Sequence, residues 1–113
     1  MKITVITVGK LKEKFFREAV SEYEKRLGRY CKLEIRETAD EKTPDGISET
    51  ERDQILQREG ERIARLLPDS AYVVTLEIEG RKFTSESFAA EIGRLGVNGV
   101  GHVVFVIGGS LGL

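Results

Sequence analysis

The chain of 113 residues carries 18 basic and 19 acidic side chains, a net charge of −1 at pH 7, and 40% of its residues are hydrophobic. This profile fits one domain with a modest core and argues against a generic, strongly basic nucleic-acid binder. A single cysteine, no apolar run near the roughly 18 residues of a membrane span, and a poor signal peptide lead us to expect a cytoplasmic protein without internal disulfides.

The first third of the chain predicts a strand, a helix and a second strand. Residues 2–8 are rich in β-branched side chains and end at Gly9, as expected of a strand that is covered on both faces. Residues 11–29 change to a helical period with one broad apolar face, and Gly28 would close that helix. Residues 32–37 alternate between apolar and polar, which predicts a half-exposed strand.

The middle of the chain predicts a polar loop and a long helix. Residues 38–47 contain a Pro-Asp-Gly turn. Ser48 and Glu51 have the spacing of a capping box, so we expect a helix from there to about Leu67. Its apolar stripe would comprise Leu56, Gly60, Ile63 and Leu67. Gly60 lowers helix propensity, which suggests a close neighbour.

The last third predicts a strand, a helix and a final strand. Residues 71–78 form the third strand, and residues 79–82 form a turn. Thr84 or Ser85 would cap a helix whose inward side chains are Phe88, Ala89, Ile92 and Leu95. Residues 103–107 are fully apolar and predict a fourth strand. The alternation of strands and helices predicts an α/β domain with a mainly parallel sheet and helices on both faces.

Charge is unevenly distributed along the chain. Residues 1–36 carry ten basic and five acidic side chains, a balance of +5, whereas residues 37–79 have a balance of −7 and residues 80–113 of +1. The basic first third could contact RNA phosphates or could be an ordinary solvated helix face. Arg81 and Lys82, which follow the third strand, leave the same two interpretations open.

Ligands of open α/β sheets bind beyond the carboxyl ends of the strands, and two such ends are unusual here. One is residues 75–80, and the other is residues 107–113, with three glycines in five positions. Glycines let a backbone approach a ligand closely, although a tight turn into a helix also uses them. The pattern is neither a dinucleotide fingerprint nor a phosphate-binding P-loop.

The other residues that invite a chemical role favour structural ones. His102, the only histidine, precedes the fourth strand at the end opposite the glycines, so we expect a structural or surface role rather than a general base. Tyr23 is expected in the core, Tyr30 at a helix end, and Cys31 as a space-filler near a strand. The acidic side chains of residues 40–45 are expected to be solvated, because they lack calcium-loop spacing. No metal site is predicted.

Three segments resemble one known family. Residues 105–113 (FVIGGSLGL) look like the glycine loop of the SPOUT methyltransferases that act on large-subunit rRNA, the rRNA large subunit methyltransferase H family. Residues 1–12 (MKITVITVGKLK) are similar to that family's start, and so is the segment of residues 76–89. The resemblance covers essentially the whole chain in order.

The resemblance implies a SPOUT-like α/β knot fold and S-adenosylmethionine as the cofactor, bound in a bent form by backbone groups. It implies methyl transfer to N3 of a pseudouridine in large-subunit (23S) rRNA, within the ribosome, by a homodimer that needs neither metal nor membrane. By match of motif, Leu76 and Gly108 would contact the cofactor, with Gly109 in the same loop.

Members of the family continue past the position of Leu113 into a helix, a strand, a second cofactor loop and a tail with Tyr and His residues. We therefore expect residues 1–113 to be a single SPOUT domain that is truncated at its carboxyl end, lacks the knot-forming part and is inactive by itself. No catalytic residue is identified. The alternative is a non-catalytic nucleotide- or RNA-binding α/β module. A flavodoxin-like or response-regulator-like domain is disfavoured, because no phosphate loop or acidic cluster follows the first strand.

Overall fold

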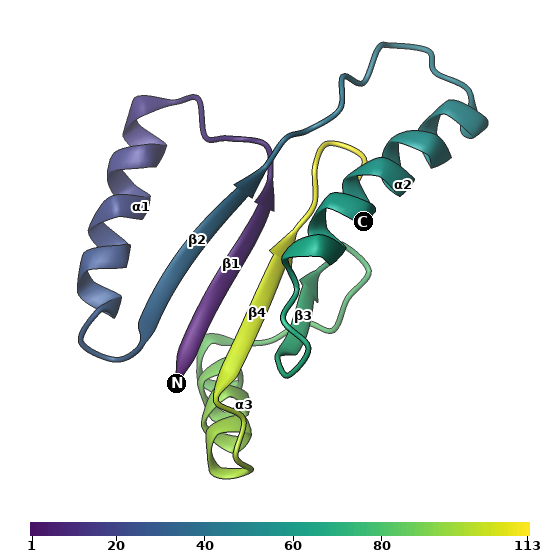
Figure 1. The fold of residues 1–113 in the computed structure, drawn as a ribbon. Helices are drawn as coiled ribbons and strands as arrows, with labels where there is room; N and C mark the ends of the chain where they lie inside the picture. The colour runs from purple at the N-terminus through teal and green to yellow at the C-terminus, as the bar shows by residue number, and fades with distance from the viewer.

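The sheet is four-stranded and parallel throughout. The computed structural model describes residues 1–113, and its strands lie in the order β2-β1-β4-β3 (Figure 1). The strands are β1 (Lys2–Val8), β2 (Lys32–Thr38), β3 (Tyr72–Leu76) and β4 (His102–Ile107). The helices are α1 (Lys14–Leu27), α2 (Glu49–Leu66) and α3 (Ser85–Val97). The predicted α/β class and element order are confirmed.

Helices cover both faces of the sheet. The chain moves one way across the sheet from β1 to β2 and from β3 to β4, and the opposite way from β2 to β3. Because such crossovers are right-handed, α1 and α3 lie on one face and α2 on the other (Figure 1). The ring of Phe88 on α3 lies 5.9 Å from that of Phe105 on β4, whereas Ile63 of α2 packs on the opposite face.

The core is centred on the two inner strands. Ile6 of β1 and Val104 and Val106 of β4 pack with Ile63 of α2 in one buried cluster. Val103 of β4 is buried on the other face, because successive side chains of a strand point to opposite sides. Burial on both faces explains why the sequence of β4 is apolar throughout.

The helix α1 differs most from its prediction. It begins at Lys14, three residues later than the periodic pattern, and none of its side chains is buried. Phe15 and Tyr23 are each 63% exposed, so the prediction of a core position for Tyr23 is wrong in this structure. The physical reason is its position, because α1 contacts the edge strand β2 and no other element lies against its outer side (Figure 1).

Two helices begin at side-chain caps. The hydroxyl of Ser48 accepts a hydrogen bond from the amide of Glu51 at 3.2 Å. The Glu51 carboxylate accepts from that hydroxyl instead of returning to the Ser48 amide, so only half of the predicted capping box forms. Of the two predicted candidates Thr84 caps α3, in a complete box with Ser87.

The inner face of α2 includes the predicted stripe but is wider, since Leu56, Gly60, Ile63 and Leu67 all line the space under the helix. Its buried residues are Ile55, Glu59 and Ile63, and only Ile63 was expected. A Cβ atom added at Gly60 would meet nothing within 4 Å, so the expectation of a close neighbour there is wrong. A carboxylate therefore occupies the centre of a helix face that otherwise packs on the sheet.

The third strand is shorter than predicted. It ends at Leu76, and the amide of Gly80 donates to the carbonyl of Glu77 in a turn that leaves Ile78 94% exposed.

On the exposed surface of α3, a hydrogen bond from Arg94 lowers the pKa of the Glu91 carboxyl and raises the pKa of the Arg94 guanidinium.

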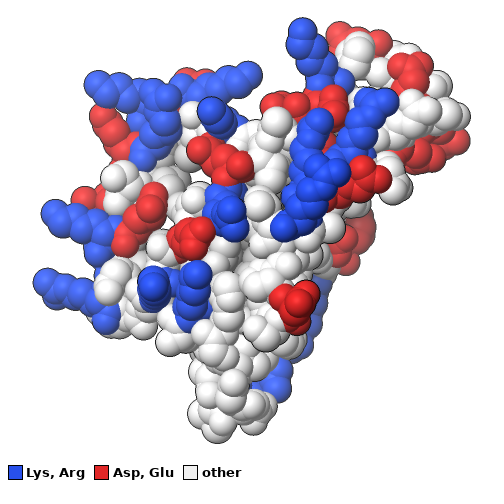
Figure 2. Space-filling view, in the orientation of Figure 1, with Lys and Arg blue, Asp and Glu red and all other residues white.

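Residues 1–113 bury little of their surface. Only nine residues are buried, and the radius of gyration of 15.5 Å exceeds the value of about 13 Å expected for a compact chain of this length. Charged side chains gather over α1 and α2, whereas the surface over α3 is mostly uncharged in this view (Figure 2). None of the helices combines the length and the apolar character that crossing a membrane requires.

Candidate functional site at the carboxyl edge of the sheet

The four strands end side by side, and we call this end the carboxyl edge. In the parallel register Leu76 lies opposite Ile107, which in turn lies opposite Thr7, and Val8 lies opposite Thr38. Loops that leave the strands here come from distant parts of the sequence. The edge is therefore the place where this fold can assemble a ligand site.

The glycine loop, Gly108–Gly112, folds back on itself immediately after β4. Gly109 and Gly112 form an isolated bridge, in which the Gly112 amide donates to the Gly109 carbonyl at 3.0 Å. A Cβ atom at Gly108 would lie 2.6 Å from the Gly112 oxygen, and Gly112 has a φ of +81°. Glycine is thus required by the turn itself at both positions.

Gly109 lies close to different neighbours. A Cβ atom there would lie 3.1 Å from Oε1 of Glu59 on α2 and 3.2 Å from Cγ1 of Val8 on β1. These distances are tighter than ordinary van der Waals contact. The absence of a side chain at Gly109 thus lets the loop approach α2 and the end of β1 closely.

The structure brings the three residues predicted to bind a cofactor to one place. Leu76 is the last residue of β3 and pairs with Ile107, the residue before Gly108, while Gly109 follows in the same loop. The side chain of Leu76 is half exposed and lies on the α3 face of the sheet, since it shares the face of Phe105. Their predicted role in cofactor binding stays a prediction.

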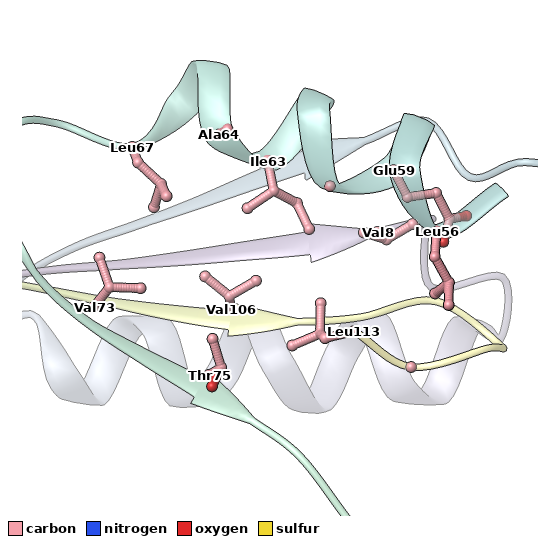
Figure 3. Close-up of a pocket in the computed structure, with 12 residues that line it drawn as sticks. Val8, Leu56, Glu59, Ile63, Ala64, Leu67, Val73, Thr75, Val106 and Leu113 are labelled. Carbon is pink, nitrogen blue, oxygen red and sulfur yellow. The ribbon is translucent and has the colours of Figure 1, made fainter. Parts of the chain in front are cut away.

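A cavity of about 210 Å³ opens beside this edge, on the face that α2 covers. Figure 3 shows Ile63, Ala64 and Leu67 of α2 above it and side chains of β1, β3 and β4 below it. The lining is mainly apolar. Its only charged member is Glu59, and Leu113 closes one side. The volume suits part of a ligand rather than a whole cofactor.

Glu59 is the functional candidate that the sequence analysis missed. Its side chain is 4% exposed; Oε2 accepts a hydrogen bond from the amide of Glu41 at 3.0 Å, whereas Oε1 is buried without any partner. The sequence did carry a signal. Ile55, Glu59 and Ile63 follow one another at four-residue spacing, which places the carboxylate on an apolar helix face.

The loop before α2, residues 39–48, forms hydrogen bonds with both α2 and the glycine loop. Arg62 pairs with Glu41 at 2.6 Å and donates to the carbonyl of Ala39 at 2.9 Å. Thr43 shares a hydrogen bond of 3.2 Å with Ser110. Glu41 is half-buried in this network, so the prediction that the acidic residues of this loop are all solvated is wrong for Glu41.

Other residues with possible chemistry lie elsewhere. His102 is the first residue of β4, at the end opposite the glycine loop, and its Nε2 lies 2.8 Å from the hydroxyl of Thr4. That position agrees with the predicted structural role. Arg81 lies over the ring of Phe83 at 4.6 Å, a cation–π contact. The structure contains no group of three or more His, Cys, Asp or Glu residues arranged to hold a metal ion.

A parallel α/β sheet with a glycine loop and a cavity at its carboxyl edge defines the class of open-sheet domains that bind ligands at that edge. Residues 1–113 match the family described as "Predicted SPOUT methyltransferase". The chain belongs to the SPOUT methyltransferase family.

Three curated relatives illustrate what the chain is similar to. It is 58% identical to "Ribosomal RNA large subunit methyltransferase H" of Bifidobacterium adolescentis and 52% identical to the protein of that name from Clostridium beijerinckii. It is 51% identical to a "Putative ribosomal RNA large subunit methyltransferase H" of Methanococcus maripaludis. Each alignment covers 100% of this chain and 71% of the relative.

Proposed function

We propose that this protein transfers the methyl group of S-adenosylmethionine to N3 of a pseudouridine in large-subunit (23S) rRNA. The observation that carries the proposal is the alignment of the whole chain with proteins named ribosomal RNA large subunit methyltransferase H. The resemblance of residues 105–113 to the glycine loop of that family supports the choice of cofactor.

The residues at the carboxyl edge fit S-adenosylmethionine. An adenine ring needs backbone hydrogen bonds and apolar cover more than it needs charged partners. Gly108 and Gly109 are half-buried and carry backbone groups in the loop that follows β4, and Leu76 offers a half-exposed apolar side chain at the end of the neighbouring strand. We propose these three as cofactor-binding residues. The unpartnered oxygen of Glu59 also fits a ligand that carries hydrogen-bond donors.

S-adenosylmethionine, when bound, supplies a methyl group that its sulfonium centre already activates. The chain then has to hold the donor in one orientation, and rigid backbone at the ends of β3 and β4 is suited to that task. The apolar lining of the neighbouring cavity would exclude water from the donor. We assign no base, because His102 is bonded to Thr4 at the opposite end of the sheet.

Large-subunit rRNA is the proposed partner, in the cytoplasm and within the ribosome. No residue of helix α1 is buried, and its basic side chains Lys14, Arg17 and Lys25 are exposed and available to RNA phosphates. Figure 2 shows Lys and Arg side chains gathered over this helix. The net charge of −1 favours a weak grip on free RNA and hence a structured ribosomal surface as the substrate. We propose a homodimer as the working form of the full-length protein.

Methyl transfer to ribosomes tests this proposal. The full-length protein is incubated with tritiated S-adenosylmethionine and ribosomes that lack the modification, and the labelled nucleotide is identified by mass spectrometry. We expect one methyl group on N3 of one pseudouridine in the large-subunit rRNA. Ribosomes that already carry the modification serve as the control and should take up no label.

The alternative, a non-catalytic nucleotide- or RNA-binding module, predicts a different result from the same experiment. The protein would bind the nucleotide or the ribosome but transfer no label to either preparation of ribosomes. Label on a different base, or on ribosomal protein, would instead show that the proposed substrate is wrong.

A further inference from the structure

Glu59 presents a carboxylate oxygen that nothing in the fold uses. The side chain of Glu59 is 4% exposed. Charged side chains that are buried to this extent are rare in proteins, and their polar atoms are nearly always paired. Here Oε2 accepts from the amide of Glu41, but Oε1 has no partner. Arg62, three residues further along α2, is already bonded to Glu41 and to the carbonyl of Ala39. A buried oxygen in this state disfavours the fold unless a donor reaches it.

The free oxygen lies where the glycine loop meets the cavity. Oε1 is 3.1 Å from the point that a Cβ atom of Gly109 would occupy. Figure 3 places Glu59 beside Val8 and Leu56, at one end of the cavity. The remaining lining is mainly apolar, so Glu59 is the group there that can select a polar or cationic ligand. Three observations thus coincide, namely the cavity, the close loop and the orphaned oxygen.

We propose that Glu59 is a ligand-binding residue whose free oxygen accepts a hydrogen bond from an ammonium or hydroxyl group of the bound methyl donor. This inference rests on the proposed function. S-adenosylmethionine has such donors on its amino-acid part and on its ribose, and a carboxylate is a strong acceptor for either. A carboxylate that recognises a sugar hydroxyl next to a glycine loop is a known solution in other α/β nucleotide sites.

The position of Glu59 argues against two other roles for its carboxylate, those of a metal ligand and of a general base. A metal site would need further carboxylate, His or Cys ligands, and no such group surrounds Glu59. A general base would have to meet the RNA base at the surface of the protein, whereas the free oxygen of Glu59 is buried at one end of a small cavity under α2, next to the glycine loop. Contact with the cofactor is the role that this geometry allows.

Calorimetric binding of S-adenosylhomocysteine to the full-length protein tests the inference. We expect Glu59→Gln to weaken binding about tenfold or more, because a charge-assisted hydrogen bond is replaced by a neutral one. The control is Glu61→Gln, on the exposed side of the same helix, where the carboxylate accepts only from Gln57. That variant should bind as the wild type does.

A second ligand identifies the donor group. The probe 5′-methylthioadenosine keeps the ribose and lacks the amino-acid part. If the ammonium is the partner, Glu59→Gln will bind this probe as tightly as the wild type does. If a ribose hydroxyl is the partner, the substitution will weaken both ligands alike. Either result supports the inference.

The inference is overturned if Glu59→Gln is folded and binds S-adenosylhomocysteine with wild-type affinity. Should the variant fail to fold, a crystal structure of the wild-type complex decides. A Glu59 oxygen within about 3.2 Å of a ligand nitrogen or oxygen supports the inference, and carboxylate contacts to protein amides alone overturn it. Wild-type protein that binds neither ligand would instead remove the proposed function, and this inference with it.

Discussion

Gly108 and Gly109 are glycines for two different reasons. Gly108 lies so close to the carbonyl of Gly112 that its own turn excludes a side chain, whereas Gly109 lies close to α2 and the end of β1. Substitutions at the two positions should therefore have different effects. One would distort the turn, and the other would push the loop away from Glu59.

We expect Gly108→Ala to lower the free energy of unfolding by about 1–3 kcal/mol, because the new methyl group overlaps backbone that has to shift. S-adenosylhomocysteine should also bind more weakly. Urea unfolding and calorimetry measure both effects. Gly101→Ala is the control, since a Cβ atom there meets nothing within 4 Å. Equal losses in the two variants would mean that the turn is not the cause.

Single residues mark the limit of what the sequence could predict. Gly108 and Gly109 were found because glycine spacing is visible in the sequence and resembles a family motif. Glu59 was not found, because a glutamate inside a helix is ordinarily solvated and only the tertiary packing of α2 buries it. The pairing of Glu41 with Arg62 was missed for the same reason, since 21 residues separate the partners.

At the scale of elements, the sequence predicted the strands better than the helix faces. The strands β1 and β4 were evident from unbroken β-branched and apolar runs, which are typical of a strand covered on both faces. The stripe predicted for α2 was incomplete, because Ile55 and Glu59 are buried beside it and helical periodicity alone does not decide how wide the buried face is. The exposure of α1 depends on what packs against it, which its own sequence does not state.

Gly60 offers a test at the element scale. It lies inside α2 with open space around it, so Gly60→Ala should raise the free energy of unfolding by about 0.5–1 kcal/mol through helix propensity. Thermal unfolding measures the change. The reverse substitution one turn later, Ala64→Gly, is the matched control and should lower stability by a similar amount. A destabilised Gly60→Ala variant would show that a neighbour does occupy that space.

At the scale of the whole molecule, the apolar surface of residues 1–113 is too large for their small core. Phe15, Tyr72, Leu76 and Ile107 are all at least 41% exposed, and they belong to α1, to the edge strand β3 and to the carboxyl end of β4. The chain spans 71% of the length of the relatives it matches. We propose that further contacts, within a longer chain or between copies, cover these surfaces in the working enzyme.

We therefore expect a polypeptide restricted to residues 1–113 to transfer no methyl group to ribosomes that lack the modification, and to aggregate through its exposed apolar side chains. The full-length protein at the same concentration is the control. Tritium incorporation measures the first effect and light scattering the second. Comparable incorporation by the two polypeptides would show that residues 1–113 suffice.

The strand order also sets when this protein can fold during its synthesis. Lys2 of β1 pairs with His102 of β4, so one edge of the first strand to be synthesised stays unpaired until β4 has been made. At about 5–20 residues per second, 100 residues take roughly 5–20 s to emerge from a ribosome. Throughout that interval β1 has a free edge, which is prone to pair with other chains. Nascent copies on one messenger RNA are therefore most vulnerable to co-aggregation before β4 appears.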